Sequence, residues 1–270
     1  MKKIISYLLG KMGFKIIDTD KFIASPLTSK FKIIALIEKL HPYKLEDELI
    51  RLGPKGDGGY LVPNDLKNIK ACFSPGVDQI SGFEEDCFKL GMQLFLADKS
   101  VVQPNLNLSA HQYSFLNKYV GCTNDQNYIT LNSWVESSKI DKDSDLLLQM
   151  DIEGGEYMTL LNMSDSLLKQ FRIIVIEFHQ LEKLWHHDFF NLAEETFNKI
   201  LQNHVCVHIH PNNWCALDVQ QGVEIPKIAE FTFVRKDRLK GKQFQTIFPN
   251  KLDYDNTRKE SIPLPKIWYK

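Results

Sequence analysis

The stretch LLLQMDIEGGEY, residues 146–157, joins an uninterrupted apolar run to three acidic residues and two glycines. A short apolar run bounded by turn residues is typical of a strand that is buried on both faces, as in a parallel sheet. Asp151 follows the run directly, and Glu153 and Glu156 follow soon after it. The stretch therefore predicts a central strand whose carboxyl end opens onto a polar turn and the start of a helix, where the helix dipole favours acidic side chains.

Strand patterns and helix patterns alternate on both sides of this stretch. The strand patterns cover residues 69–76, 92–98, 128–134, 144–151, 171–179, 204–210 and 230–236. The helix patterns cover residues 83–91, 111–121 and 189–203. Such alternation predicts an α/β fold, namely a doubly wound, mostly parallel seven-stranded sheet with helices on both faces.

The first part of the chain has a different pattern. Residues 1–50 show apolar spacing near 3.6, which predicts an N-terminal helical extension before one α/β domain over residues 51–270. The first apolar run, before Gly10, is far shorter than the ~20 residues of a transmembrane helix. No signal-peptide cleavage site follows it. We therefore expect no transmembrane segment.

Composition excludes some classes of protein. The formal net charge is -1 over 270 residues, which disfavours a non-specific nucleic-acid binder, since such proteins carry a basic excess. The five cysteines are scattered without a CxxC pair. This pattern is typical of reduced thiols in a cytoplasmic protein and not of a disulfide frame or a zinc site.

Candidate ligand-binding residues follow the first two predicted strands of the sheet. Gly76 ends one strand, where glycine allows a ligand to approach the backbone closely. Asp98 ends the next, where an acid can accept hydrogen bonds from ribose hydroxyls. The chain has no GxGxxG turn here, which favours a nucleoside ligand without a pyrophosphate. The alternative is that Gly76 is a plain turn and Asp98 a surface cap.

Further candidates lie before the sheet. The turn DGGY contains Asp57 and Tyr60, and its two glycines permit close approach to a ligand. Tyr60 could stack on that ligand or form a hydrogen bond with it. An ordinary turn before a strand is the alternative interpretation of this segment.

Acids and histidines follow the later strands. Asp151 should lie deep in the crevice, and a buried carboxylate needs a cation, a metal or a donor. Glu177 and His179 end the next strand, as His208 and His210 end the one after, and residues two apart share a face. Asp, Glu and His converging on one crevice suit a divalent metal such as Mg, Mn or Fe. The alternative for each histidine is an imidazole with a purely structural role.

Four segments together resemble the FkbM-type S-adenosylmethionine-dependent methyltransferases. They are RLGPKGDGGYLVP (51–63), FSPGVDQISGFEEDCFKLG (73–91), LLLQMDIEGGEY (146–157) and IIVIEFHQ (173–180). The resemblance implies a Rossmann-like class I methyltransferase sheet whose last strand runs antiparallel. It also implies O-methylation of a sugar hydroxyl, in the branch that serves bacterial capsule or lipopolysaccharide synthesis. The loop SPGVDQ (74–79) has fewer glycines than the common family pattern.

The resemblance also implies roles for the candidate residues. Asp98 would hold the ribose, the Gly76 turn the methionine end, and residues near 130–134 the adenine side. Asp57, Tyr60 and Asp151 would complete the cofactor site.

The methyl acceptor must lose a proton, which a general base can take. A metal would instead lower the pKa of a coordinated hydroxyl. Asp151, His179 and His210 are the catalytic candidates, and Asp151, Glu177 and His179 are the candidate metal ligands.

The leading interpretation is a cytoplasmic methyltransferase that acts on a sugar or nucleotide-sugar acceptor. The sequence is compatible with a monomer and with a homo-oligomer. The connection at residues 211–229 should cover the acceptor. One alternative is a metal-dependent hydrolase, which would leave Gly76 and Asp98 without a purpose. Another is a catalytically silent binding subunit, which has no reason to bury so many acids.

Overall fold

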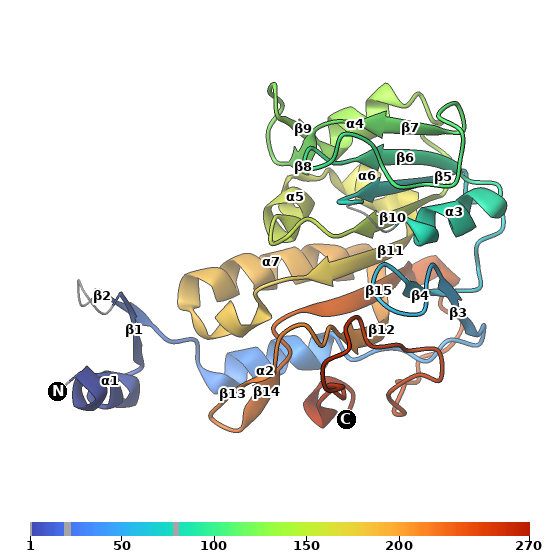
Figure 1. Ribbon diagram of the computed structural model, residues 1–270. Coiled ribbons are helices and arrows are strands. Elements are labelled where there is room, and N and C mark those ends of the chain that lie inside the picture. The colour runs from blue at the N-terminus through green and yellow to red at the C-terminus, as the bar shows by residue number, and fades with distance from the viewer. Residues whose placement is uncertain (1, 19–22, 78–80) are drawn as a thin grey trace.

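A seven-stranded sheet forms the centre of the computed structural model, which describes residues 2–18, 23–77 and 81–270 (Figure 1). The strand order is β12-β15-β11-β10-β5-β6-β7. The strands are β5 (Ala71–Pro75), β6 (Gln93–Ala97), β7 (Tyr113–Leu116), β10 (Leu146–Met150), β11 (Phe171–Phe178), β12 (His204–Pro211) and β15 (Ala229–Arg235). β15 runs antiparallel to both of its neighbours, and the other pairs are parallel. The predicted mostly parallel sheet, with an antiparallel last strand, is confirmed.

Strand β10 is buried over its whole length, which explains the apolar run that precedes Asp151. Leu146 and Leu148 pack into one hydrophobic core, on one face of the sheet, and Leu147 packs into the core on the other face. Because successive side chains point to opposite faces, a strand covered on both sides has no polar alternation.

Helices cover both faces of the sheet. One core contains residues from α2 (Lys30–Lys39), α4 (Leu131–Ser137), α5 (Glu156–Asn162), α6 (Asp165–Gln170) and α7 (His187–Asn203). The other contains residues from α3 (Gly82–Lys89) and from the hairpin of β3 (Leu49–Leu52) and β4 (Tyr60–Pro63). This arrangement confirms the doubly wound architecture.

The remaining short elements lie outside the central sheet. They are the strand pairs β8 (Tyr119–Gly121) with β9 (Tyr128–Thr130) and β13 (Asp218–Gln220) with β14 (Val223–Ile225), and the 3-10 turns η1 (Leu181–Trp185), η2 (Lys236–Arg238) and η3 (Lys266–Trp268).

Two predicted elements are wrong. Residues 111–121 do not form a helix, because residues 113–116 pair with β6 as the edge strand of the sheet and residues 119–121 form β8. Residues 128–134 are a strand only as far as Thr130, whose side chain accepts a hydrogen bond from Ser133 N and caps α4. The cap begins a helix where the apolar pattern suggested a longer strand.

The N-terminal residues differ in part from the predicted helical extension. Helix α1 (Lys2–Lys11) is present, but a hairpin of β1 (Phe14–Asp18) and β2 (Ile23–Pro26) follows it. These elements stand apart from the body of the molecule (Figure 1). Helix α2 instead buries Ile33 and Leu36 in the main core. The boundary predicted at residue 50 falls inside β3.

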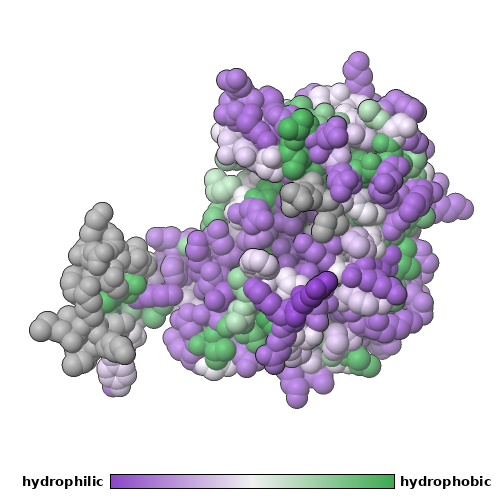
Figure 2. Space-filling view, in the orientation of Figure 1, coloured by the Kyte–Doolittle hydropathy of each residue, from purple (hydrophilic) through white to green (hydrophobic). Residues whose placement is uncertain are grey.

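The surface is mostly polar on the face seen in Figure 2, and hydrophobic residues lie there in small, separate groups. Among the described helices, none combines the length and apolarity that a bilayer crossing requires.

Candidate active site

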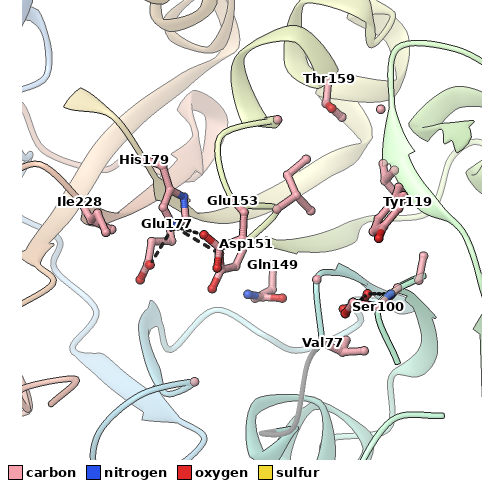
Figure 3. Close-up of a pocket in the computed structure, with 18 of the residues that line it drawn as sticks. Val77, Ser100, Tyr119, Gln149, Asp151, Glu153, Thr159, Glu177, His179 and Ile228 are labelled. Carbon is pink, nitrogen blue, oxygen red and sulfur yellow. Dashed lines mark hydrogen bonds and ion pairs between the residues drawn. The ribbon is translucent and has the colours of Figure 1, made fainter. Parts of the chain in front are cut away.

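A cavity of about 1210 Å³ lies at the carboxyl ends of β5, β6, β10 and β11 (Figure 3). The five residues predicted to bind a cofactor all line it: Asp57, Tyr60, Gly76, Asp98 and Asp151. Glu177 and His179 line it as well. Parallel strands bring their carboxyl ends to one edge of a sheet, which is why residues far apart in sequence meet here.

Gly76 follows β5 directly and lies against the backbone of Asp151, which follows β10. Its φ is +84°, and a Cβ at this position would lie 1.5 Å from the backbone oxygen of Asp151. Its N–H donates to the backbone oxygen of Ala97, at 3.0 Å. Glycine is therefore required by conformation and by space, because the backbone of Asp151 occupies the place of a side chain. Gly76 also lines the cavity.

Asp98 ends β6 at the same edge and is 7% exposed. Its Oδ1 accepts hydrogen bonds from the N–H and the hydroxyl of Ser100, each at 2.7 Å. These bonds orient the carboxylate, and Asp98 lines the cavity, as a ribose-binding residue would.

Residues 130–134, which were predicted to lie on the adenine side, do not line the cavity. Trp134 is buried in the core against Phe73, with ring centroids 5.1 Å apart, and does not line the cavity. Tyr119 and Tyr128 line it from β8 and β9, with ring centroids 5.5 Å apart. The aromatic surface of the cavity therefore comes from β8, which was predicted as part of a helix, and from β9, which is the first part of the strand predicted at residues 128–134.

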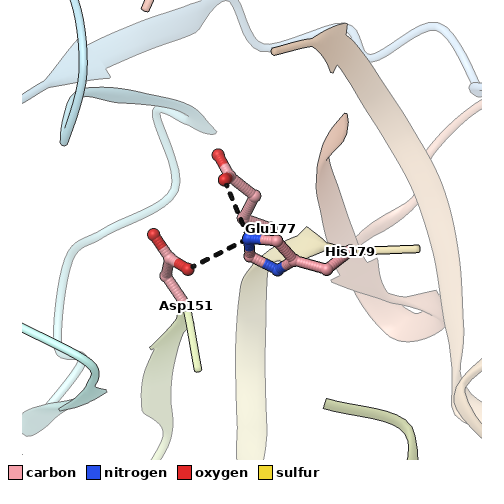
Figure 4. A group of neighbouring side chains, drawn as sticks. All are labelled: Asp151, Glu177 and His179. Carbon is pink, nitrogen blue, oxygen red and sulfur yellow. Dashed lines mark ion pairs between the residues drawn. The ribbon is translucent and has the colours of Figure 1, made fainter. Parts of the chain in front are cut away.

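Asp151, Glu177 and His179 converge on one point of the cavity (Figure 4). The Nε2 of His179 lies 3.4 Å from Glu177 Oε1 and 3.9 Å from Asp151 Oδ1. One potential ligand atom from each residue lies within 4.8 Å of the others. Asp151 Oδ1 is buried and has no hydrogen-bond partner among the described residues. The predicted trio is thus brought together, with an orphaned oxygen that suits a cation.

Glu156 contacts the Nδ1 side of the His179 ring, opposite the Nε2 that faces Asp151 and Glu177. It is fully buried, and its Oε1 accepts hydrogen bonds from the N–H groups of Ile152 (3.1 Å) and Gly154 (3.0 Å). The same oxygen lies 3.1 Å from Nδ1 of His179. A proton on Nδ1 that donates to this carboxylate leaves Nε2 to face Asp151 and Glu177.

From the sequence, Glu156 was expected only to favour the start of the helix. Its contact with the turn could have been predicted from Gly154 and Gly155, because a tight turn leaves backbone N–H groups that need an acceptor.

Crowded charges shift the pKa values of this group. Burial alone would lower the pKa of His179, but its hydrogen bond with Glu156 and the nearby carboxylates outweigh burial and raise the pKa to about 9. Burial and the charge of Glu230 raise the pKa of Glu177 to about 8. Burial and the charge of Glu177 raise the pKa of Asp151 well above its usual value. The group therefore favours a bound proton or cation.

His210 lies outside this group and does not line the cavity. Its Nδ1 is 3.8 Å from Asp253, and His208 Nε2 is 2.9 Å from the same carboxylate. The two histidines share a face, as their spacing predicts, but that face contacts a C-terminal segment. The predicted catalytic role of His210 therefore has no support from proximity to Asp151.

The C-terminal segment also forms part of the cavity wall through Asn256 and Thr257. Asn256 donates to Glu230 at 2.8 Å, and Thr257 N–H donates to the side-chain oxygen of Asn213 at 2.8 Å. Asn212 donates to both carboxylate oxygens of Glu177, at 3.2 and 3.1 Å. The C-terminal part of this wall has no periodic pattern, so it could not be predicted from the sequence.

A comparison with known protein families identifies a methyltransferase FkbM domain over residues 97–204. The matched segment contains Asp98, Asp151, Glu156, Glu177 and His179. The resemblance to the FkbM methyltransferases is therefore confirmed over these residues, and the match supports a methyltransferase. No curated protein matches the chain at a significant level.

Proposed function

We propose that this protein is an S-adenosylmethionine-dependent O-methyltransferase that modifies a sugar hydroxyl. The observation that carries the proposal is one cavity that joins two sites. The Gly76 turn and Asp98 line one part of this cavity and would form the cofactor side, and the trio of Asp151, Glu177 and His179 would form the acceptor side. The FkbM domain match supports methyl transfer as the reaction.

On the cofactor side, the residues fit a nucleoside linked to an amino acid. Asp98 would accept hydrogen bonds from the ribose hydroxyls, and the space beside Gly76 would admit the methionine end. Tyr119 and Tyr128 offer aromatic surface to the adenine. When bound, S-adenosylmethionine supplies a methyl group activated on a sulfonium.

On the acceptor side, Asp151, Glu177 and His179 would govern the proton of the hydroxyl. In transfer, the bond between oxygen and methyl forms, the bond between sulfur and methyl breaks, and the hydroxyl proton must leave. The pKa of about 8 suits Glu177 to take a proton near neutral pH. The same three residues would hold a Mg, Mn or Fe ion, which would lower the pKa of a hydroxyl bound to it.

A sugar or nucleotide-sugar acceptor fits the cavity mouth. Trp214 lines it and is 60% exposed, which offers an aromatic face to a sugar ring. Lys259 Nζ lies 4.0 Å from the centre of that ring and places a positive charge where a phosphate could bind. We extend the proposal to a cytoplasmic enzyme. Its acceptor would be a nucleotide-linked sugar that is used to build a surface polysaccharide.

Calorimetric titration with S-adenosylhomocysteine tests the cofactor side. We expect the protein to bind it, and Asp98→Ala to weaken binding by about 2–4 kcal/mol, because two hydrogen bonds to a charged acceptor are lost. A control titration with Asp143→Ala, at an exposed aspartate outside the cavity, should be unchanged. If the wild type does not bind, a hydrolase that uses the same acids becomes the better explanation.

A methyl-transfer screen over nucleotide sugars tests the acceptor side. Each reaction is run with a chelator, and again after Mg or Mn is added back. Activity that the chelator abolishes and the metal restores supports the metal arrangement, and activity that the chelator leaves unchanged supports a metal-free general base.

A further inference from the structure

A second polar cluster lies beneath the cavity and has no part in the acid–base chemistry. It consists of Ser74 on β5, Glu84 on α3 and Gln149 on β10, all at most 3% exposed. Glu84 and Gln149 line the cavity, and Figure 3 shows Gln149 among its lining residues. Ser74 is two residues before Gly76, so the cluster adjoins the turn that lines the cavity at Gly76.

The hydrogen bonds within this cluster do not satisfy its oxygens. Ser74 Oγ lies 2.5 Å from Glu84 Oε1 and 2.6 Å from Gln149 Oε1, although a hydroxyl has one hydrogen to donate. The other carboxylate oxygen of Glu84, Oε2, is buried and finds no partner within the described part of the chain. An unpaired buried carboxylate oxygen is costly, so the arrangement calls for a donor.

We infer that Glu84 receives the α-ammonium group of the methionine end of S-adenosylmethionine. The inference rests on the proposed function, because it needs that cofactor in the cavity. An ammonium group has three N–H donors and a positive charge, so it would both pair with Oε2 and neutralise the carboxylate. Ribose on Asp98 and methionine beside Gly76 would bring that group to the end of β5, where Glu84 lies.

Two features of the site agree with this assignment. Burial, partly opposed by the Ser74 hydrogen bond, raises the pKa of Glu84 to about 7, so a nearby cation would favour the charged form. The neighbouring Glu85 is bound elsewhere, since its Oε1 accepts from the N–H of Asn107 at 2.7 Å. Glu84 is thus the acid of this helix that is directed to the cavity.

The test is a binding cycle with two ligands. One ligand is S-adenosylhomocysteine, and the other is its deamino analogue, which keeps the carboxylate and lacks the ammonium. Both are titrated calorimetrically into the wild type, into Glu84→Gln and into the control Glu85→Gln. We expect the wild type and the control to prefer the homocysteine ligand by about 10- to 100-fold, as for a hydrogen-bonded charge pair. In Glu84→Gln this preference should vanish.

The outcomes separate this inference from the proposed function. Equal binding of both ligands to the wild type overturns the inference and leaves the cofactor assignment intact, and this measurement does not depend on whether Glu84→Gln folds. A Glu84→Gln variant that keeps the full preference also overturns it. If neither ligand binds to the wild type, the proposed function itself fails. Thermal unfolding of each variant shows whether the cluster is needed for folding.

Discussion

Glu156 joins the acidic turn to His179, because one carboxylate oxygen accepts from two backbone N–H groups and from the imidazole. Such a contact fixes both the ring orientation and the nitrogen that carries the proton. Glu156 does not line the cavity, so we expect it to act by positioning His179.

We predict that Glu156→Gln lowers kcat by about 10- to 100-fold, the usual cost of removing an outer carboxylate behind a functional histidine. It should also lower the pKa of His179, since Glu156 helps to raise it. Kinetics and NMR titration of the histidine measure the two effects. Glu153→Gln is the matched control, because Glu153 is 3.4 Å from the same ring but 87% exposed, and should change kcat less than about threefold. Wild-type kcat with an unshifted His179 would refute the role of Glu156.

Asp151 carries a separate prediction. Asp151→Asn keeps the shape of the side chain and removes its charge, so a general base or a metal ligand is lost. We expect kcat to fall by about 10²–10⁴, while S-adenosylhomocysteine binds nearly normally. If Asp151 is a ligand, added Mn should restore part of the activity, and it should not do so for a base. A kcat close to the wild type would instead assign the proton to Glu177 or His179.

The site residues on strand ends could be predicted from the sequence, and those on the C-terminal segment could not. Asp151, Glu177 and His179 follow buried strands, and parallel strands bring such ends together. Asn256 meets Asp57 at 3.3 Å across 199 residues of sequence. A contact of this length depends on how the tail folds back, for which the local sequence has no periodic signal.

At the scale of elements, burial decides which predictions succeed. Strand β10 is covered on both faces, so its unbroken apolar run is distinctive. Strand β7 is a four-residue edge strand with no buried residue, and its pattern was mistaken for a helix. Short edge strands gain most of their order from pairing with a neighbour, in this case β6, which periodicity cannot show.

The turn between β5 and α3 allows a matched prediction at this scale. Gly76 and Gly91 have similar φ values, +84° and +88°, but only Gly76 has atoms of the described chain close to its missing Cβ. Both alanine substitutions should cost about 1–2 kcal/mol of conformational strain. Gly76→Ala should also push β5 and Asp151 apart, so only this variant should lose S-adenosylhomocysteine binding. Equal effects of the two changes, measured by titration and by chemical unfolding, would show that the close approach does not matter.

At the scale of the whole molecule, the sheet supports two ends of the chain that differ in their contribution to the fold. The C-terminal segment packs against the acceptor side of the cavity through Asp253, Asn256 and Thr257. The N-terminal elements α1, β1 and β2 stand off the body, and Tyr7 and Met12 are 63% and 64% exposed. We therefore expect the folded domain to include α2 and the C-terminal segment and to depend little on α1.

This difference predicts where the chain can be shortened. A variant that lacks residues 1–24 removes α1 and β1, in which none of residues 7–16 is buried, so its free energy of unfolding should stay within about 0.5 kcal/mol of the wild type. Leu36→Ala in α2, at a side chain only 1% exposed, should cost about 2–5 kcal/mol, because it leaves a cavity in the main core. Urea unfolding compares the two variants, and titration with S-adenosylhomocysteine should be unchanged in the truncated one. A truncation as costly as Leu36→Ala would place the first helix within the folded body, and a harmless Leu36→Ala would support a domain that begins near residue 50.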